Sequence, residues 1–124
     1  MTVENLWYDG NVIRGHSKEI KGPEFEYEYD IEDPSFKILH HTAMICCEAR
    51  FDIKDEELKN PGFKYATASV IGDASETALV KFYQPIEDVV KTRSFYALGK
   101  SKDGSESKMP FNSTNKYALS IVRQ

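Results

Sequence analysis

Residues 109–122 read MPFNSTNKYALSIV, a small polar stretch between two segments that contain apolar residues. Asn112 to Asn115 are turn-forming residue types, so Met109 to Phe111 and Lys116 to Val122 are expected to be two strands joined by that turn. A connection this short can join antiparallel strands, whereas parallel strands need a long crossover. This end of the chain therefore predicts antiparallel pairing.

The N-terminal end carries a second hairpin pattern. Residues 1–8 alternate well enough for a strand, Asp9-Gly10-Asn11 supplies a turn, and Val12 and Ile13 suggest a returning strand. Residues 24–31 then alternate strictly between apolar and acidic positions. That period of two indicates a strand, or an ordered loop, because four acids would share one face of the strand.

Helical patterns lie between these two ends. Asp33-Pro34 is a good start for a helix over 34–50, and a short helix is expected over 54–60. A third helix is predicted from Gly72-Asp73 towards Pro85, and a fourth over 86–94. Helices interleaved with strands that have short connections predict an α+β fold, an antiparallel β-sheet flanked by helices, rather than a doubly wound parallel sheet.

Length and composition predict one globular domain. The chain has 124 residues, of which 40% are hydrophobic and 29% are charged. A formal net charge of −4 argues against a nucleic-acid partner, because a protein that binds the phosphate backbone needs a basic surface. No apolar run approaches the ~20 residues of a membrane span, so we expect a soluble monomer without membrane contact.

Two cysteines and two histidines lie close together in the sequence. Adjacent Cys46 and Cys47 are expected to be reduced, because a disulfide between neighbours is strained. With His40 and His41 they are candidate zinc ligands, but the sequence contains no second ligand cluster. A helix with small residues packed inward is the favoured interpretation, and no metal is predicted.

The segment Gly72-Asp73-Ala74-Ser75-Glu76 has two interpretations. Asp73 three residues before Glu76 is the spacing of a capping box, which explains both residues without a ligand. A carboxylate on the first turn of a helix can also accept a hydrogen bond from an exocyclic amine of a base. The two roles are compatible.

Phe111 and Lys116 also have two interpretations each. Phe111 is either a strand residue packed into the sheet or, if exposed in a polar loop, a platform on which a base stacks. Lys116 is either a solvated charge or, near Phe111, a point charge that holds phosphate. No Ser/His/Asp or Cys/His constellation is supported by spacing, so no catalytic residue is predicted.

Four strings along the chain resemble the nucleotide-binding domain of P-type cation pumps, most closely the sodium/potassium and proton/potassium pump alpha subunits. They are Met1-Thr2-Val3 followed by Trp7, Cys47 to Phe51 (where Glu48-Ala49-Arg50 departs from the family order), Gly72 to Leu79, and Pro110 to Tyr117. The strings follow the family order and cover residues 1–124, which the resemblance implies are a nucleotide-binding domain.

The resemblance implies ATP as the ligand (Mg-ATP in a full-length pump), with Glu76, Phe111 and Lys116 in the site and Asp73 as a supporting or capping residue. It implies the phosphorylation and actuator domains of a parent pump as partners, on the cytoplasmic side of a membrane. The phosphorylated aspartate and later pocket residues of the family have no counterpart here, which implies a fragment of the domain that should not hydrolyse ATP.

Ala118 stands where family members usually carry glutamine, which puts one pocket contact in doubt. An alternative is therefore open: a non-catalytic protein-interaction domain that retains this fold without useful nucleotide binding. The acidic residues 24–30 would be its docking surface.

Overall fold

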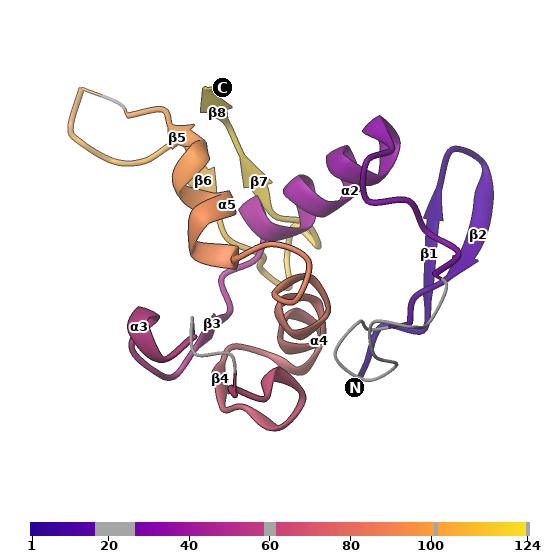
Figure 1. Cartoon of the computed structure of the whole chain (residues 1–124). Coiled ribbons are helices and arrows are strands. Elements are labelled where there is room, and N and C mark those ends of the chain that lie inside the picture. The colour runs from indigo at the N-terminus through magenta and orange to yellow at the C-terminus, as the bar shows by residue number, and fades with distance from the viewer. Residues whose placement is uncertain (17–26, 59–61, 101, 124) are drawn as a thin grey trace.

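The structure is a computed structural model that describes residues 1–16, 27–58, 62–100 and 102–123 (Figure 1). Its elements follow the chain in this order: β1 (Asn5–Tyr8), β2 (Asn11–Arg14), α2 (Pro34–Ile45), β3 (Arg50–Phe51), α3 (Asp55–Leu58), a 3-10 turn (Tyr65–Thr67), β4 (Val70–Ile71), α4 (Ala74–Tyr83), α5 (Val89–Phe95), β5 (Ala97–Leu98), β6 (Lys108–Met109), β7 (Leu119–Ser120) and β8 (Val122–Arg123). The predicted α+β class with antiparallel strands is confirmed.

Within the described residues, the strands form four separate two-stranded antiparallel sheets: β1 with β2, β3 with β4, β5 with β8 and β6 with β7. The predicted N-terminal hairpin is present, and Asp9 and Gly10 turn it with positive φ angles of 51° and 76°. Because side chains alternate along a strand, Leu6 and Tyr8 are buried while Trp7 is exposed.

The core lies where α2 meets α4, α5 and β1 (Figure 1). It is rich in aromatic rings: Tyr29 stacks on Phe36 at a centroid distance of 5.4 Å, and Tyr83 stacks on His40 at 4.4 Å. Phe82 packs edge-on against Tyr83. The helices α2 and α4 supply these rings apart from that of Tyr29, whereas α5, which has only seven residues, buries Val89 and Thr92 and depends on packing against α2 for its stability.

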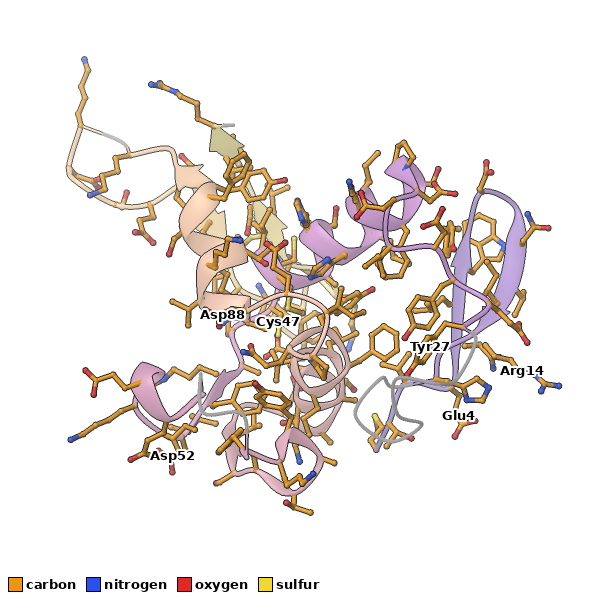
Figure 2. All side chains as sticks on the ribbon, viewed as in Figure 1. Glu4, Arg14, Tyr27, Cys47, Asp52 and Asp88 are labelled. Carbon is orange, nitrogen blue, oxygen red and sulfur yellow. The ribbon has the colours of Figure 1, made fainter. Side chains whose placement is uncertain are left out.

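The strand interpretation of residues 24–31 is wrong for the part that the structure describes, and residues 24–26 lie outside it. Residues 27–31 form an irregular segment that turns at Asp30, whose carbonyl accepts from the N–H of Asp33. The alternation is nevertheless real, because Tyr29 is buried whereas Glu28 is exposed. Tyr27, labelled in Figure 2, packs against the core. This is the ordered-loop alternative, in which side chains rather than a strand ladder anchor the backbone.

The helix predicted over 34–50 ends earlier, at Ile45. Asp33 caps its start by accepting from the N–H of Ser35, as predicted. Its end is set by a residue far along the chain, since the guanidinium of Arg93 donates to the carbonyls of Met44, Cys47 and Ala49 at 2.9, 2.8 and 2.7 Å. Those carbonyls are satisfied outside a helix, so residues 47–49 can leave the helix and lead into β3.

The C-terminal strands are shorter than predicted. Only Lys108–Met109 and Leu119–Ser120 pair across the turn, and Phe111 and Lys116 lie outside both strands. Lys116 has a φ angle of 65°, a left-handed conformation that does not continue a strand. The loop over 110–118 therefore projects beyond the β6–β7 pair.

Candidate functional site

The first turn of α4 carries two of the predicted site residues. Asp73 is the N-cap, and its carboxylate accepts from the N–H of Glu76 at 2.8 Å, so the predicted cap is confirmed. Gly72 has a φ angle of 152°, and a Cβ there would lie 2.7 Å from the Cβ of Ala49. Gly72 thus allows the start of α4 to approach the segment that leads into β3.

The carboxylate of Glu76 does not complete the capping box. Its Oε1 instead accepts from the backbone N–H of Glu48 at 3.3 Å. Within the part of the chain that the structure describes, Oε2 has no hydrogen-bond partner, and the side chain is only partly buried. Glu76 therefore keeps an acceptor oxygen for a ligand while its other oxygen is held in place.

The loop after β6 carries the other two predicted residues. Phe111 is 60% exposed and Lys116 is also exposed, so Phe111 is not the buried strand residue that was one of its two interpretations. Asn112 fixes the loop between them: its Oδ1 accepts from the N–H groups of Thr114 and Asn115, and its carbonyl accepts from the N–H of Lys116. An aromatic face and an ammonium group thus flank one closed turn.

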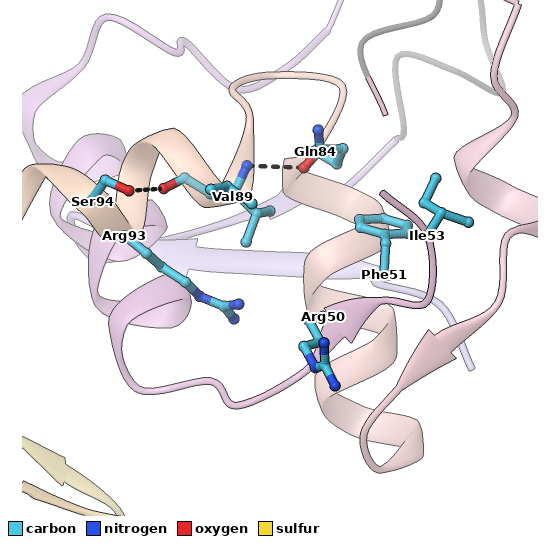
Figure 3. Close-up of a pocket in the computed structure, with 8 residues that line it drawn as sticks. Arg50, Phe51, Ile53, Gln84, Val89, Arg93 and Ser94 are labelled. Carbon is cyan, nitrogen blue, oxygen red and sulfur yellow. Dashed lines mark hydrogen bonds between the residues drawn. The ribbon is translucent and has the colours of Figure 1, made fainter. Parts of the chain in front are cut away.

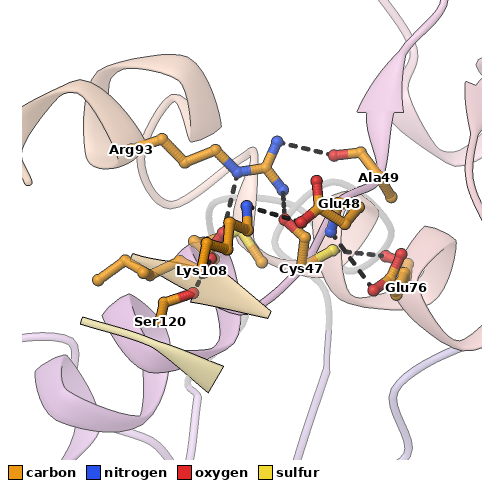
Figure 4. Close-up of polar contacts among 9 residues, drawn as sticks. Cys47, Glu48, Ala49, Glu76, Arg93, Lys108 and Ser120 are labelled. Carbon is orange, nitrogen blue, oxygen red and sulfur yellow. Dashed lines mark hydrogen bonds and ion pairs between the residues drawn. The ribbon is translucent and has the colours of Figure 1, made fainter. Parts of the chain in front are cut away.

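Glu48 links the two segments (Figure 4). Its backbone N–H donates to Glu76 on α4, and its carboxylate pairs with the ammonium of Lys108 on β6 at 2.7 Å. Lys108 precedes Phe111 by three residues, which spans at most about 10 Å of chain. No hydrogen bond or ion pair among the described residues joins Glu76, Phe111 and Lys116 directly, so the structure connects their segments but not their side chains.

The cysteine next to this link is shielded. Cys47 is buried near the centre of the molecule (Figure 2), and its thiol donates to the carbonyl of Glu76 at 3.8 Å. Burial raises the pKa of the Cys47 thiol, which keeps it protonated and unreactive. Cys46 and Cys47 are both free thiols.

The histidines that suggested a metal site have other surroundings. His41 Nδ1 lies 2.5 Å from the hydroxyl of Tyr96, and His40 is buried against Tyr83. Across the described ranges, no three His, Cys, Asp or Glu side chains gather as a possible metal site.

A separate pocket of about 370 Å³ lies beside β3 and α5 (Figure 3). It is lined by Arg50, Phe51, Ile53, Gln84, Val89, Val90, Arg93 and Ser94. The guanidinium of Arg93 is already occupied by three backbone carbonyls, and Gln84 is held by Asp88 and the N–H of Val89. The pocket contains none of the four predicted site residues.

Sequence reasoning missed Glu48, Lys108 and Arg93 as residues that organise the site. Glu48 and Lys108 are 60 positions apart, and isolated charges of this kind are usually solvated, so no local spacing could have indicated their pairing. The departure at Glu48-Ala49-Arg50 from the pump pattern was the one signal that this segment differs.

Comparison with known proteins identifies relatives along nearly the whole chain, although no protein-family profile matches it. The chain is 33% identical over 122 residues to a sodium/potassium-transporting ATPase alpha subunit of Drosophila melanogaster. It is 34% identical over 122 residues to potassium-transporting ATPase alpha chain 2 of Homo sapiens, and 32% identical over 122 residues to alpha chain 1 of Xenopus laevis. Each alignment covers 98% of this chain but only 10% of the relative, so the chain spans about a tenth of the length of these relatives. Among the described residues, no helix has the length and apolar character needed to cross a bilayer.

Proposed function

Because the chain is homologous, over nearly all its length, to one segment of cation-transporting ATPase alpha subunits, we propose that it is the ATP-binding domain of a P-type cation pump. In this role it holds adenine and presents the γ-phosphate to a phosphorylation domain outside this chain. The observation that carries the proposal is the exposure of Phe111, since a buried ring could not stack on a base.

The three proposed contacts divide the nucleotide between them. The free oxygen of Glu76 accepts a hydrogen bond from the amino group of adenine, Phe111 stacks on the base, and Lys116 attracts phosphate. Asp73 supports Glu76 by capping the helix. One stacking contact and one charge-assisted hydrogen bond contribute a few kcal/mol before the cost of ordering the ligand, so the expected dissociation constant is on the order of 0.1–10 mM.

Titration with ATP, followed by the backbone amide signals of the chain, tests the proposal. Saturable shifts are expected at residues 111–117, at Glu76 and at Glu48, whose amide donates to the Glu76 carboxylate. Adenosine should reproduce the shift at Glu76 but not the shift at Lys116. An absence of shifts at ~10 mM ATP, or shifts confined to the pocket beside β3 and α5, would overturn the proposal.

Hydrolysis of ATP is assigned to the partner domains. The three proposed contacts accept a hydrogen bond from the base, stack on it and attract phosphate, and none of them is a phosphoryl acceptor. A clean preparation of the chain should therefore bind ATP without turnover, and release of phosphate at a rate above the uncatalysed one would contradict this.

A protein-interaction domain is the second candidate, and the hairpin favours it. Trp7 and Val12 stand opposite each other in the β1–β2 register and are 68% and 71% exposed. A paired, exposed apolar surface of this kind is common where proteins dock. This candidate predicts that Trp7→Ser weakens the capture of a protein partner. It also predicts that ATP shifts no backbone amide signals near Phe111.

A further inference from the structure

The peptide group between Cys47 and Glu48 is held from both sides (Figure 4). Its carbonyl accepts from Arg93 at 2.8 Å, and its N–H donates to Glu76 at 3.3 Å. Because a trans peptide is planar, its C=O and N–H point in opposite directions. Arg93 and Glu76 therefore form hydrogen bonds with opposite edges of the same rigid peptide group. The carbonyl of Ala49, on the other side of Glu48, also accepts from Arg93. The backbone of Glu48 is therefore fixed relative to α4 and α5.

The side chain of Glu48 reaches in a third direction. Its Oε1 lies 2.7 Å from Nζ of Lys108, whose side chain is only 23% exposed. The β6–β7 pair that carries Lys108 is also held to α2 by a hydrogen bond, in which the hydroxyl of Ser120 donates to the carbonyl of Ile45 at 3.3 Å. An ion pair that is partly shielded from water is stronger than a fully exposed one.

We propose that Glu48 is a positioning residue for the nucleotide site. Its backbone N–H orients the Glu76 carboxylate. Its ion pair with Lys108 fixes the position of β6, and therefore the position of the Phe111 ring, relative to that carboxylate. The proposal rests on the ATP-binding function proposed above, and it adds a coupling between the group that reads the edge of the base and the group that stacks on its face.

A double-mutant cycle on the ion pair measures this coupling. Glu48→Gln and Lys108→Gln should each weaken ATP binding by ~2–5-fold, the size expected for one partly shielded ion pair. The double variant should bind no more weakly than either single variant, because both remove the same interaction. Lys108→Arg keeps the charge and should bind like the unmodified chain.

Glu32 and Lys37 provide a matched control. They form a side-chain ion pair at 2.9 Å near the start of α2, and both are more exposed than Lys108. The same cycle with Glu32→Gln and Lys37→Gln should leave the ATP dissociation constant unchanged within twofold. If both cycles weaken binding equally, the effect is one of general charge or stability, and the proposal is wrong.

A second measurement works without nucleotide. Exchange of the amide protons of Thr114, Asn115 and Lys116 with water should speed up in Glu48→Gln and stay at the rate of the unmodified chain in Lys108→Arg. If exchange responds while ATP binds nowhere, the coupling stands and the proposed function fails. If ATP binds at Phe111 but neither the amide exchange rates nor the ATP affinity changes in Glu48→Gln, the positioning role is overturned while the proposed function stands.

Discussion

At the scale of the residue, Phe111 is an apolar ring that the fold leaves in water. It is 60% exposed and belongs to no strand, so its contribution to the free energy of unfolding is small. Its position beside a turn fixed by Asn112 restrains the backbone to which the ring is attached. A restrained exposed ring loses little conformational freedom when a base stacks on it.

Phe111→Ala should therefore weaken ATP binding by ~1–3 kcal/mol and leave the unfolding midpoint nearly unchanged. Phe95 is a matched control, because it is 63% exposed and lies on α5. Phe95→Ala should have no effect on ATP affinity. A severe loss of stability in Phe111→Ala would instead assign the ring to the core.

Glu76→Gln tests which atom reads the base. Guanine presents a carbonyl oxygen where adenine presents an amino group, and a carboxylate facing that oxygen leaves an unpaired acceptor that costs about 1–3 kcal/mol. ATP should thus be preferred over GTP by about tenfold or more in the unmodified chain.

The Glu76→Gln side chain can donate to guanine, so the ratio of the GTP dissociation constant to the ATP dissociation constant should fall towards one. Its amide oxygen can still accept from the N–H of Glu48, and Asp73 still caps the helix, so stability should be retained. An unchanged ratio in the variant would mean that Glu76 supports the backbone and that the base is read elsewhere.

At the scale of the element, one side chain decides where α2 ends. The helical pattern of residues 34–50 gives no reason to stop at Ile45, and the stop comes from Arg93, 48 positions beyond it. The planar guanidinium donates in three directions at once to backbone carbonyls.

Arg93→Met should lower the free energy of unfolding by ~2–4 kcal/mol, since three carbonyls lose their charged donor while the apolar stem is kept. Arg93→Lys should restore little of this, because an ammonium cannot match the fork geometry. The midpoint of urea unfolding measures both, and Arg50→Met, at an exposed neighbouring arginine, is the control. Equal effects at the two positions would contradict the role given to Arg93.

At the scale of the whole molecule, the helical core contains a titratable group. His40 is 3% exposed, stacks on Tyr83 and has a buried Nε2 without a partner among the described residues. Burial, the largest cause, and the neighbouring His41 together lower its pKa from 6.5 to about 4, against the opposing effect of Glu87. Between pH values equal to these two pKa values, His40 therefore binds a proton in the unfolded chain but not in the folded chain.

Stability should accordingly be full above pH 6.5 and should fall as pH drops from 6.5 towards 4, by an amount on the order of 3 kcal/mol. Carboxylates also titrate in part of this range, so the difference from His40→Phe isolates the histidine. Urea unfolding at several pH values should give a shallower pH dependence for the variant. Parallel profiles for the two proteins would show that His40 is not the group responsible.

Local chemistry was enough to predict several features of this protein. Asp73 before Glu76, Asp33 before Pro34, and Asp9-Gly10-Asn11 specify two helix starts and a hairpin turn, because caps and turns are made by residues within four positions of one another. The antiparallel α+β class follows from those short connections, and the strings around Glu76 and Phe111 indicate a relationship to cation pumps.

Tertiary structure decided the features that depend on distant partners. The end of α2, the loop conformation of residues 27–31, the exposure of Phe111 and the Glu48–Lys108 ion pair each require a contact, or its absence, between segments many residues apart. Periodicity reports which face of a segment is apolar, but not what will cover that face or satisfy its carbonyls. Those outcomes are settled only when the chain packs, since burial and hydrogen bonding are properties of the assembled molecule.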